Sequence, residues 1–241
     1  MAANHATREK INWLLLESVL IVASILLAFW IDAWWDGRKD ALEEKEILVG
    51  LEVEFTDLRE RLDRWANMNR TGVKLIDRLL SESVKEMDLP ELEFAFTHTI
   101  VANVLDQGGA LDALLASGRL ERITDRDLRA RLVKWPDWLE DIHTNDLSAR
   151  EVTIHVIAPF LAKYGFPGRT CDDEGSFFLA CPAPGPVPPA YRELVEDPEF
   201  RATLIMRRAW LNVMANDHEM AREEADKILE ILRSSLLQEG G

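Results

Sequence analysis

Cysteine and tyrosine are scarce in this chain of 241 residues, which contains two of each. Cys171 and Cys181 lie in one stretch rich in proline and glycine, so they form either a small disulfide clip or two unrelated free thiols. Metal binding is disfavoured because this stretch offers too few further ligands. We favour the disulfide, which persists outside the cytoplasm.

Positive charge is also in short supply. Lys and Arg number 28 against 43 Asp and Glu, which gives a formal net charge of -15. A nucleic acid would be repelled by such a surface, so we expect no nucleic-acid partner.

The sequence lacks a Gly-rich phosphate loop, a G-x-S-x-G elbow and an H-E-x-x-H motif. The five histidines are scattered, and no spacing places two of them on one helical turn. We therefore expect no enzyme activity, no catalytic residues, no cofactor and no metal site.

Alternating strand patterns are absent over any useful length, and proline concentrates in residues 166–190. The sequence therefore predicts an all-α protein. We expect one N-terminal transmembrane helix followed by an extramembrane helical bundle with long first and last helices, and a Pro/Gly-rich loop at 166–190 that carries the cysteine pair.

Against these absences stands one long apolar run, Ile11–Trp35. As a helix it would extend roughly 37 Å, enough to cross a hydrocarbon core of about 30 Å. Tryptophans at both ends suit the headgroup level and predict an interface belt of Trp13, Trp30, Trp34 and Trp35. The alternatives are a cleaved signal peptide and a buried helix of a soluble protein, but the run is long for a signal and no small-x-small cleavage site follows it.

Basic residues flank both ends of the anchor, so their distribution does not predict its orientation. Our prediction of the orientation therefore uses the cysteines. We expect residues 1–10 to be a short cytoplasmic tail, residues 11–35 to span the membrane, and residues 36–237 to form the helical bundle domain. A disulfide in that domain places the bulk of the chain in the periplasm or outside the cell.

The segment after the anchor carries apolar residues at steps of three and four, which indicates a helix that packs along another helix: Leu48, Leu51, Phe55, Leu58, Leu62 and Trp65. Gly37, a poor residue for a helix interior, is interpreted as a hinge at the membrane surface.

Asp197 and Pro198 predict the start of the last helix, with Asp as N-cap and Pro in the first turn. The helix continues to the glycines at the end and is long enough to return antiparallel to the first. Its apolar face comprises Leu204, Leu211, Met214, Ala221, Ala225, Ile228 and Leu232. Arg207 and His218 fill the two gaps in that face and are interpreted as buried, satisfied polar residues, with ligand sensing as the alternative.

Shorter helices are expected between these two. The pattern predicts helices over Leu89–Leu105, over Arg126–Lys134 capped by Thr124 or Asp125, and over Asp146–Tyr164 with a kink at Pro159; it predicts a turn at Ser117–Gly118 and an interruption at Pro136.

The segment Glu17–Trp35, ESVLIVASILLAFWIDAWW, resembles the N-terminal anchor of a set of uncharacterised bacterial membrane proteins. Their anchor has the general form E-x-x-L-[IV]-x-x-[GS]-I-L-[IL]-A followed by a polar residue and Trp, here Asp32 and Trp34. The resemblance extends to an acidic segment and a central block: Glu43–Glu46, Asp112–Gly118, Leu120, Ile123 and Asp127–Arg129. It implies a single-pass protein of the bacterial inner membrane and no activity. The cysteine-containing loop is not a feature of that family.

The apolar run contains two carboxylates: Asp32 lies at its far interface, whereas Glu17 lies inside it, where burial in hydrocarbon is costly. At about 100° per residue, Glu17 shares a narrow helical sector with Ile21, Ser24, Ala28 and Trp35. Ser24 and Ala28 form a small-xxx-small pair, which favours close helix–helix contact.

This face leads to two hypotheses beside a shallow glutamate at the interface. In the first, the anchor associates with copies of itself or with a membrane-protein partner, and the helical domain is a non-enzymatic interaction or sensor module. In the second, the anchors form an oligomeric bundle that conducts protons or cations through Glu17.

Overall fold

The computed structural model describes residues 3–100, 109–166 and 185–238, with side chains described from Leu20 onward. Within these residues every regular element is a helix, which confirms the all-α prediction. The elements are α1 (Ala3–Leu80), η1 (Glu82–Glu86), α2 (Leu89–Ile100), α3 (Ala110–Ala116), η2 (Arg119–Arg122), α4 (Arg126–Val152), η3 (Thr153–Ile157), α5 (Ala158–Lys163), α6 (Pro189–Glu196) and α7 (Pro198–Gln238).

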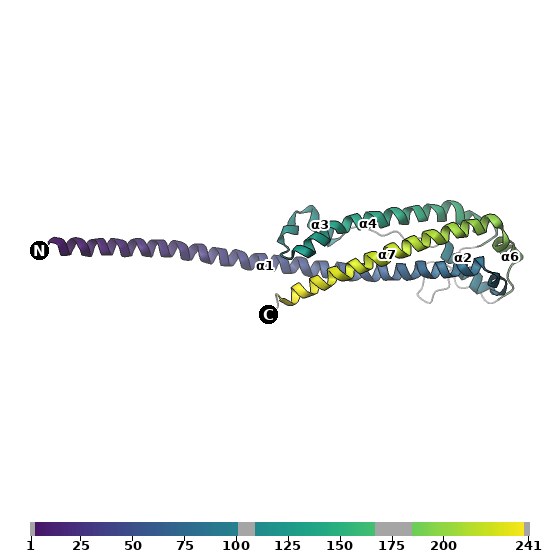
Figure 1. Ribbon diagram of the computed structural model, residues 1–241, viewed down its shortest axis with the longest axis horizontal. Helices are drawn as coiled ribbons and strands as arrows, with labels where there is room; N and C mark the ends of the chain where they lie inside the picture. Colours follow the sequence, from purple (N-terminus) through teal and green to yellow (C-terminus); the bar gives the residue numbers. More distant parts are fainter. Residues whose placement is uncertain (1–2, 101–108, 167–184, 239–241) are drawn as a thin grey trace.

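Helix α1 has 78 residues and joins two very different environments. Its N-terminal part projects alone, whereas its C-terminal part lies along α7 (Figure 1) and contacts α4 through Phe55 and Trp135. We call the part of the structure from Leu48 onward the helical body.

Helices α1 and α7 run antiparallel in a constant register. Ion pairs bridge them at intervals along their length: Glu52 with Arg233 at 3.0 Å, Asp226 with Arg59 at 2.9 Å, and Asp77 with Arg208 at 2.5 Å. The long last helix expected from Asp197 onward is confirmed, and Asp197 Oδ1 accepts hydrogen bonds from the N–H groups of Glu199 and Phe200.

The helical body has two apolar clusters, one at each end. The cluster nearer the projecting part of α1 contains Leu48, Leu51, Phe55, Leu58 and Leu62 of the predicted stripe, with Trp65 packed against it partly buried. The far cluster combines the end of α1 with α2, α6 and the start of α7. The face expected on α7 is buried along both clusters.

Helix α4 begins at Arg126 because Asp125 caps it, its side chain accepting from the N–H of Leu128 at 2.9 Å. The interruption expected at Pro136 is wrong, since α4 passes through Pro136 to Val152. Proline removes one helical hydrogen bond. The neighbouring Trp135 is 1% exposed and stacks edge-on against Phe55 at 5.1 Å, so packing holds the helix together there.

The irregularity expected at Pro159 lies just before it. Thr153–Ile157 forms a π-helical turn, and α5 then starts at Ala158. Such turns occur as single insertions within α-helices. The predicted turn at Ser117–Gly118 is confirmed, because Gly118 adopts a φ of 67° that favours glycine.

Two boundaries differ from expectation. Helix α1 continues through Gly37 without a break, so the hinge expected there is wrong. Helix α2 is described only to Ile100, and the rest of the predicted Leu89–Leu105 segment lies outside the described residues.

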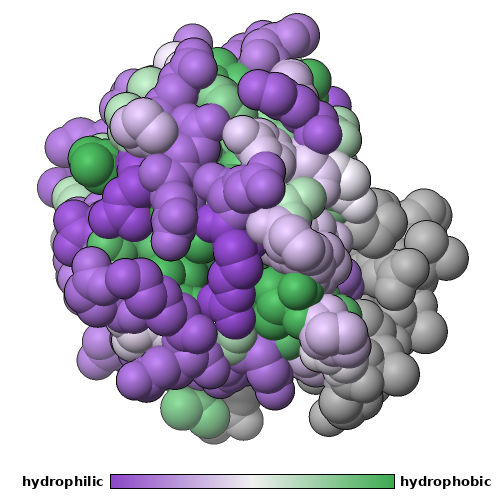
Figure 2. All heavy atoms as spheres, turned by 90° about the vertical axis from the view of Figure 1, so that its right-hand side faces the viewer, coloured by the Kyte–Doolittle hydropathy of each residue, from purple (hydrophilic) through white to green (hydrophobic). Residues whose placement is uncertain are grey.

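Figure 2 shows the end of the molecule opposite the projecting helix, and its described surface is largely hydrophilic with small apolar areas. The large exposed apolar surface therefore lies at the other end, on α1.

Candidate functional site

The first candidate site is the projecting part of α1. One helix near the N-terminus is long and apolar enough to cross a membrane, and its most apolar window is wholly unburied. The large apolar side chains from Leu20 to Trp35 are all exposed, by fractions that range from 49% (Ile31) to 67% (Phe29). Nothing else in the described chain covers them.

Ile21, Ser24 and Ala28 all lie on this exposed surface, as the helical sector requires. The Ser24 hydroxyl donates to the carbonyl of Leu20 at 2.7 Å, so it is already satisfied within its own helix. Ser24 therefore presents a small surface that needs no further hydrogen bond.

Three of the four belt tryptophans are described, and all three are exposed: Trp30, Trp34 and Trp35. The guanidinium of Arg38 lies over the Trp34 ring at 6.0 Å, a cation–π arrangement at the C-terminal end of the apolar run. The side chains of Trp13 and Glu17 lie outside the described part of the structure, so the role of Glu17 stays a prediction.

The segment of α1 that follows the tryptophans is held by the turn around η2. Arg122 pairs with Asp40, and Glu44 accepts from both the N–H and the hydroxyl of Thr124. Thr124, one of two candidate caps for α4, thus binds α1 instead. These contacts tie the projecting helix to the helical body directly after the apolar run.

Glu54 adds a further contact of the same kind. Its carboxylate accepts from the backbone N–H of Leu111 at 2.9 Å, at the start of α3. A β-carbon placed on Gly109 would clash with the Glu54 carboxylate, so glycine permits this close approach.

The second candidate site is a buried polar layer, which we define as Asn69 of α1, Asp146 of α4 and His218 of α7. All three side chains are at most 3% exposed. They occupy the level between the two apolar clusters on each of the three long helices. Asn69 Nδ2 lies 3.2 Å from His218 Nδ1, and His218 Nε2 lies 3.5 Å from Asp146 Oδ2.

The burial expected of His218 is confirmed, and so is that of Arg207. Arg207 Nη1 donates to the carbonyl of Ala149 at 3.3 Å, immediately before the π-helical turn. Burial lowers the pKa of Arg207 to about 10, so the guanidinium stays charged at neutral pH.

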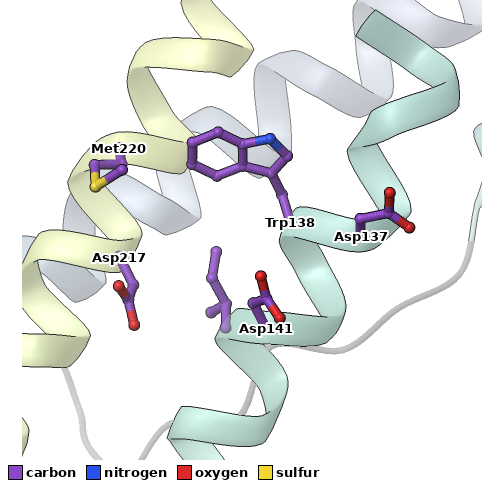
Figure 3. Close-up of a pocket in the computed structure, with 6 residues that line it drawn as sticks. Asp137, Trp138, Asp141, Asp217 and Met220 are labelled. Carbon is purple, nitrogen blue, oxygen red and sulfur yellow. The ribbon is translucent and has the colours of Figure 1, made fainter.

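The third candidate is a surface pocket of about 300 Å³ between α4 and α7 (Figure 3). Trp138 and Met220 form its apolar wall, while Asp141 and Asp217 flank the opening below the Trp138 ring. Asp217 also accepts from Asn145 at 2.8 Å. Carboxylates beside an indole suit a cationic group rather than an anionic one.

Some sequence predictions fall outside these sites. Cys171 and Cys181 lie outside the described residues, so the disulfide stays a prediction. Among the described residues, no group of three or more His, Cys, Asp or Glu is placed to hold a metal ion.

Sequence reasoning missed Asn69 and Asp146 as partners of His218. Only Asn69 had a sequence signal: it follows Leu58, Leu62 and Ala66 on the buried side of α1, where an apolar residue would be expected. Nothing in the local pattern links Asp146 to the other two, because their contact depends on how three distant helices align.

Comparison of the chain with protein-family models, with curated proteins and with solved structures finds no match.

Proposed function

We propose that this chain is a single-pass membrane protein whose anchor associates with another transmembrane helix and whose helical bundle acts outside the membrane as a non-enzymatic interaction module. The observation that carries the proposal is that one unbroken helix is exposed and apolar from Leu20 to Trp35 and packed into the helical body from Leu48 onward.

The exposed apolar surface from Leu20 to Trp35 supports a lipid environment for residues 11–35. Exposed apolar patches on soluble monomers rarely exceed a few hundred Å². A helix that exposes nearly every large side chain from Leu20 to Trp35 exceeds what water tolerates, whereas hydrocarbon accepts it. The tryptophans and Arg38 suit the headgroup level at the end of that segment.

Association of the anchor is supported by the face that contains Ser24 and Ala28. Small residues let helix backbones approach closely, which in lipid replaces the hydrophobic driving force available in water. The satisfied Ser24 hydroxyl supports this role, because it would enter such a contact without a buried unpaired donor.

Attachment of the anchor to the helical body supports a module that responds to its partner in the membrane. Gly37 is spanned by helix, and Asp40 and Glu44 are bound by the η2 turn. A rotation or tilt of the anchor would therefore move the start of the helical body with it.

The proposal also covers the cellular location of the chain and its family. A disulfide between Cys171 and Cys181 would favour a periplasmic body, and the resemblance of Glu17–Trp35 and Asp112–Gly118 supports a bacterial inner-membrane protein of the uncharacterised family described above.

The association is tested by small-to-large substitutions in the full chain reconstituted into lipid vesicles, with self-association measured by resonance energy transfer between labelled copies and partner capture measured from native membranes. Ser24→Leu and Ala28→Leu should each weaken association about tenfold or more, equivalent to roughly 1.4 kcal/mol.

Ala33→Leu is the matched control, because Ala33 is equally exposed and lies on the opposite side of the helix from Ser24. It should leave association unchanged. If all three variants associate as the parent does, the proposed face is wrong.

A further inference from the structure

The polar layer of Asn69, Asp146 and His218 is costly for the fold. Apolar residues of similar volume in a helical core are often as stable as buried charged groups or more so. Here each of the three long helices contributes one polar side chain at the same level, between two apolar clusters. The layer therefore requires an explanation other than stability.

The two ring nitrogens of His218 face different groups. Asn69 Nδ2 lies 3.2 Å from His218 Nδ1; in this orientation the amide nitrogen donates to the ring, whereas an amide turned over presents its oxygen as an acceptor for a ring N–H. On the other side of the ring, Nε2 faces Asp146 Oδ2 at 3.5 Å, and both side chains are fully buried.

We propose that this layer is a proton-binding site of the helical body. The ligand is a proton from solvent, which adds to His218 Nδ1. The amide of Asn69 then turns over, so that Oδ1 replaces Nδ2 and accepts the new N–H. Asp146 supplies the negative charge that faces the imidazolium through Nε2.

The groups around the ring are consistent with this single proton. From α1, Asn69 and the indole of Trp65 face it, the latter with ring centres 5.5 Å apart. From α4, Asp146 faces it, and His143 lies one helical turn before Asp146. On α7 itself, Asp217 accepts from Asn145, Glu219 pairs with Arg70, and Arg222 pairs with Asp226. The buried Arg207 donates to the carbonyl of Ala149, three residues after Asp146.

Because the layer joins α1, α4 and α7 where the two clusters meet, its charge state changes the attraction between these helices at that level. Histidine is the side chain that ordinarily changes charge between about pH 5 and 8. Proton binding itself is a property of the helical body; only its use as a signal to a membrane partner rests on the proposed function.

The test uses the full chain in detergent micelles with 15N-labelled histidine, followed by NMR across the pH range in which the fold is intact. His218→Gln identifies the ring by loss of its signals, and His155→Gln is the control because His155 is exposed and pairs with Glu151, four residues earlier. We expect His218 Nδ1 to move from the acceptor to the protonated range, and the Asn69 side-chain amide to shift with the same midpoint. Asn69→Leu should move that midpoint.

Two results would overturn the inference. One is a His218 ring that keeps one tautomer and no charge throughout the range. The other is a ring that titrates while the Asn69 amide does not respond and Asn69→Leu leaves the midpoint unchanged. Neither result depends on whether the anchor associates, so failure here is separate from failure of the proposed function.

Discussion

At the scale of single residues, the ends of elements are set by side chains that satisfy backbone groups. Asp125 binds the N–H of Leu128 and begins α4, whereas Thr124 beside it is occupied by Glu44 of α1. The sequence limited the cap to these two residues, and a contact between helices far apart in the chain decided between them.

Replacing Asp125 by Ala should lower the free energy of unfolding by about 1 kcal/mol, because the cap hydrogen bond at the start of α4 is lost. Asp125→Asn keeps the acceptor and is the matched control. Denaturant unfolding of the full chain in mild detergent measures both; equal losses for Ala and Asn would show that the cap is not the cause.

Glu224 predicts a defined dependence of stability on pH. Burial alone would raise the pKa of its carboxyl, but hydrogen bonds from Arg131 and from Lys227, the latter at 3.1 Å, more than offset it and lower that pKa. Since the folded pKa is depressed, the stabilisation is present above the unfolded value of about 4.3 and is lost as pH falls through the folded value.

Glu224→Gln should therefore cost about 1 kcal/mol of unfolding free energy at neutral pH, and the difference from the parent should shrink under acid conditions. Glu223→Gln, at the exposed neighbouring position, should cost little at any pH. A Glu224→Gln penalty that stays constant down to the lowest pH at which the protein folds would contradict this account.

At the scale of elements, periodic apolar patterns predicted the buried faces correctly, whereas two of the residues expected to interrupt helices did not. The steps of three and four from Leu48 to Leu62 and the face of α7 are buried as expected, because burial of an apolar face is what such patterns encode. Pro136 and Gly37 failed to break their helices, because packing of Trp135 and the contacts around η2 outweigh local propensity.

Gly37→Ala tests the continuity of α1 directly. A β-carbon at Gly37 meets nothing within 4 Å, so alanine should stabilise the chain by about 0.5–1 kcal/mol in the same unfolding measurement. Gly118→Ala is the contrast, because its φ of 67° disfavours a side chain and the change should destabilise. A loss of stability in Gly37→Ala would indicate that the helix bends there.

Trp135 determines how α4 is attached. It fills the space between α4 and Phe55 of α1, so Trp135→Ala should cost about 3–5 kcal/mol of unfolding free energy. Trp138→Ala, which alters the partly exposed wall of the pocket in Figure 3, should cost much less. Similar penalties would mean that α4 does not depend on the Trp135 contact.

At the scale of the whole molecule, helix α1 passes through two environments. The apolar side chains from Leu20 to Trp35 are exposed, and the stripe from Leu48 to Leu62 is buried in the helical body. The polar segment between them is bound by the η2 turn (Figure 1). Composition and hydropathy suffice to predict that division. They do not predict the polar layer, whose three members come from helices aligned by packing rather than by any local pattern.

The most direct test of the account is an accessibility scan along α1. Single cysteines would be placed from position 20 to position 56 in a chain whose Cys171 and Cys181 are replaced by serine, spin-labelled, and reconstituted into vesicles. The account predicts access to oxygen but not to a water-soluble relaxation agent up to Trp35, a reversal after Gly37, and a helical period in the packed segment beyond Leu48. Free access of the water-soluble agent along the whole segment would contradict membrane insertion of α1.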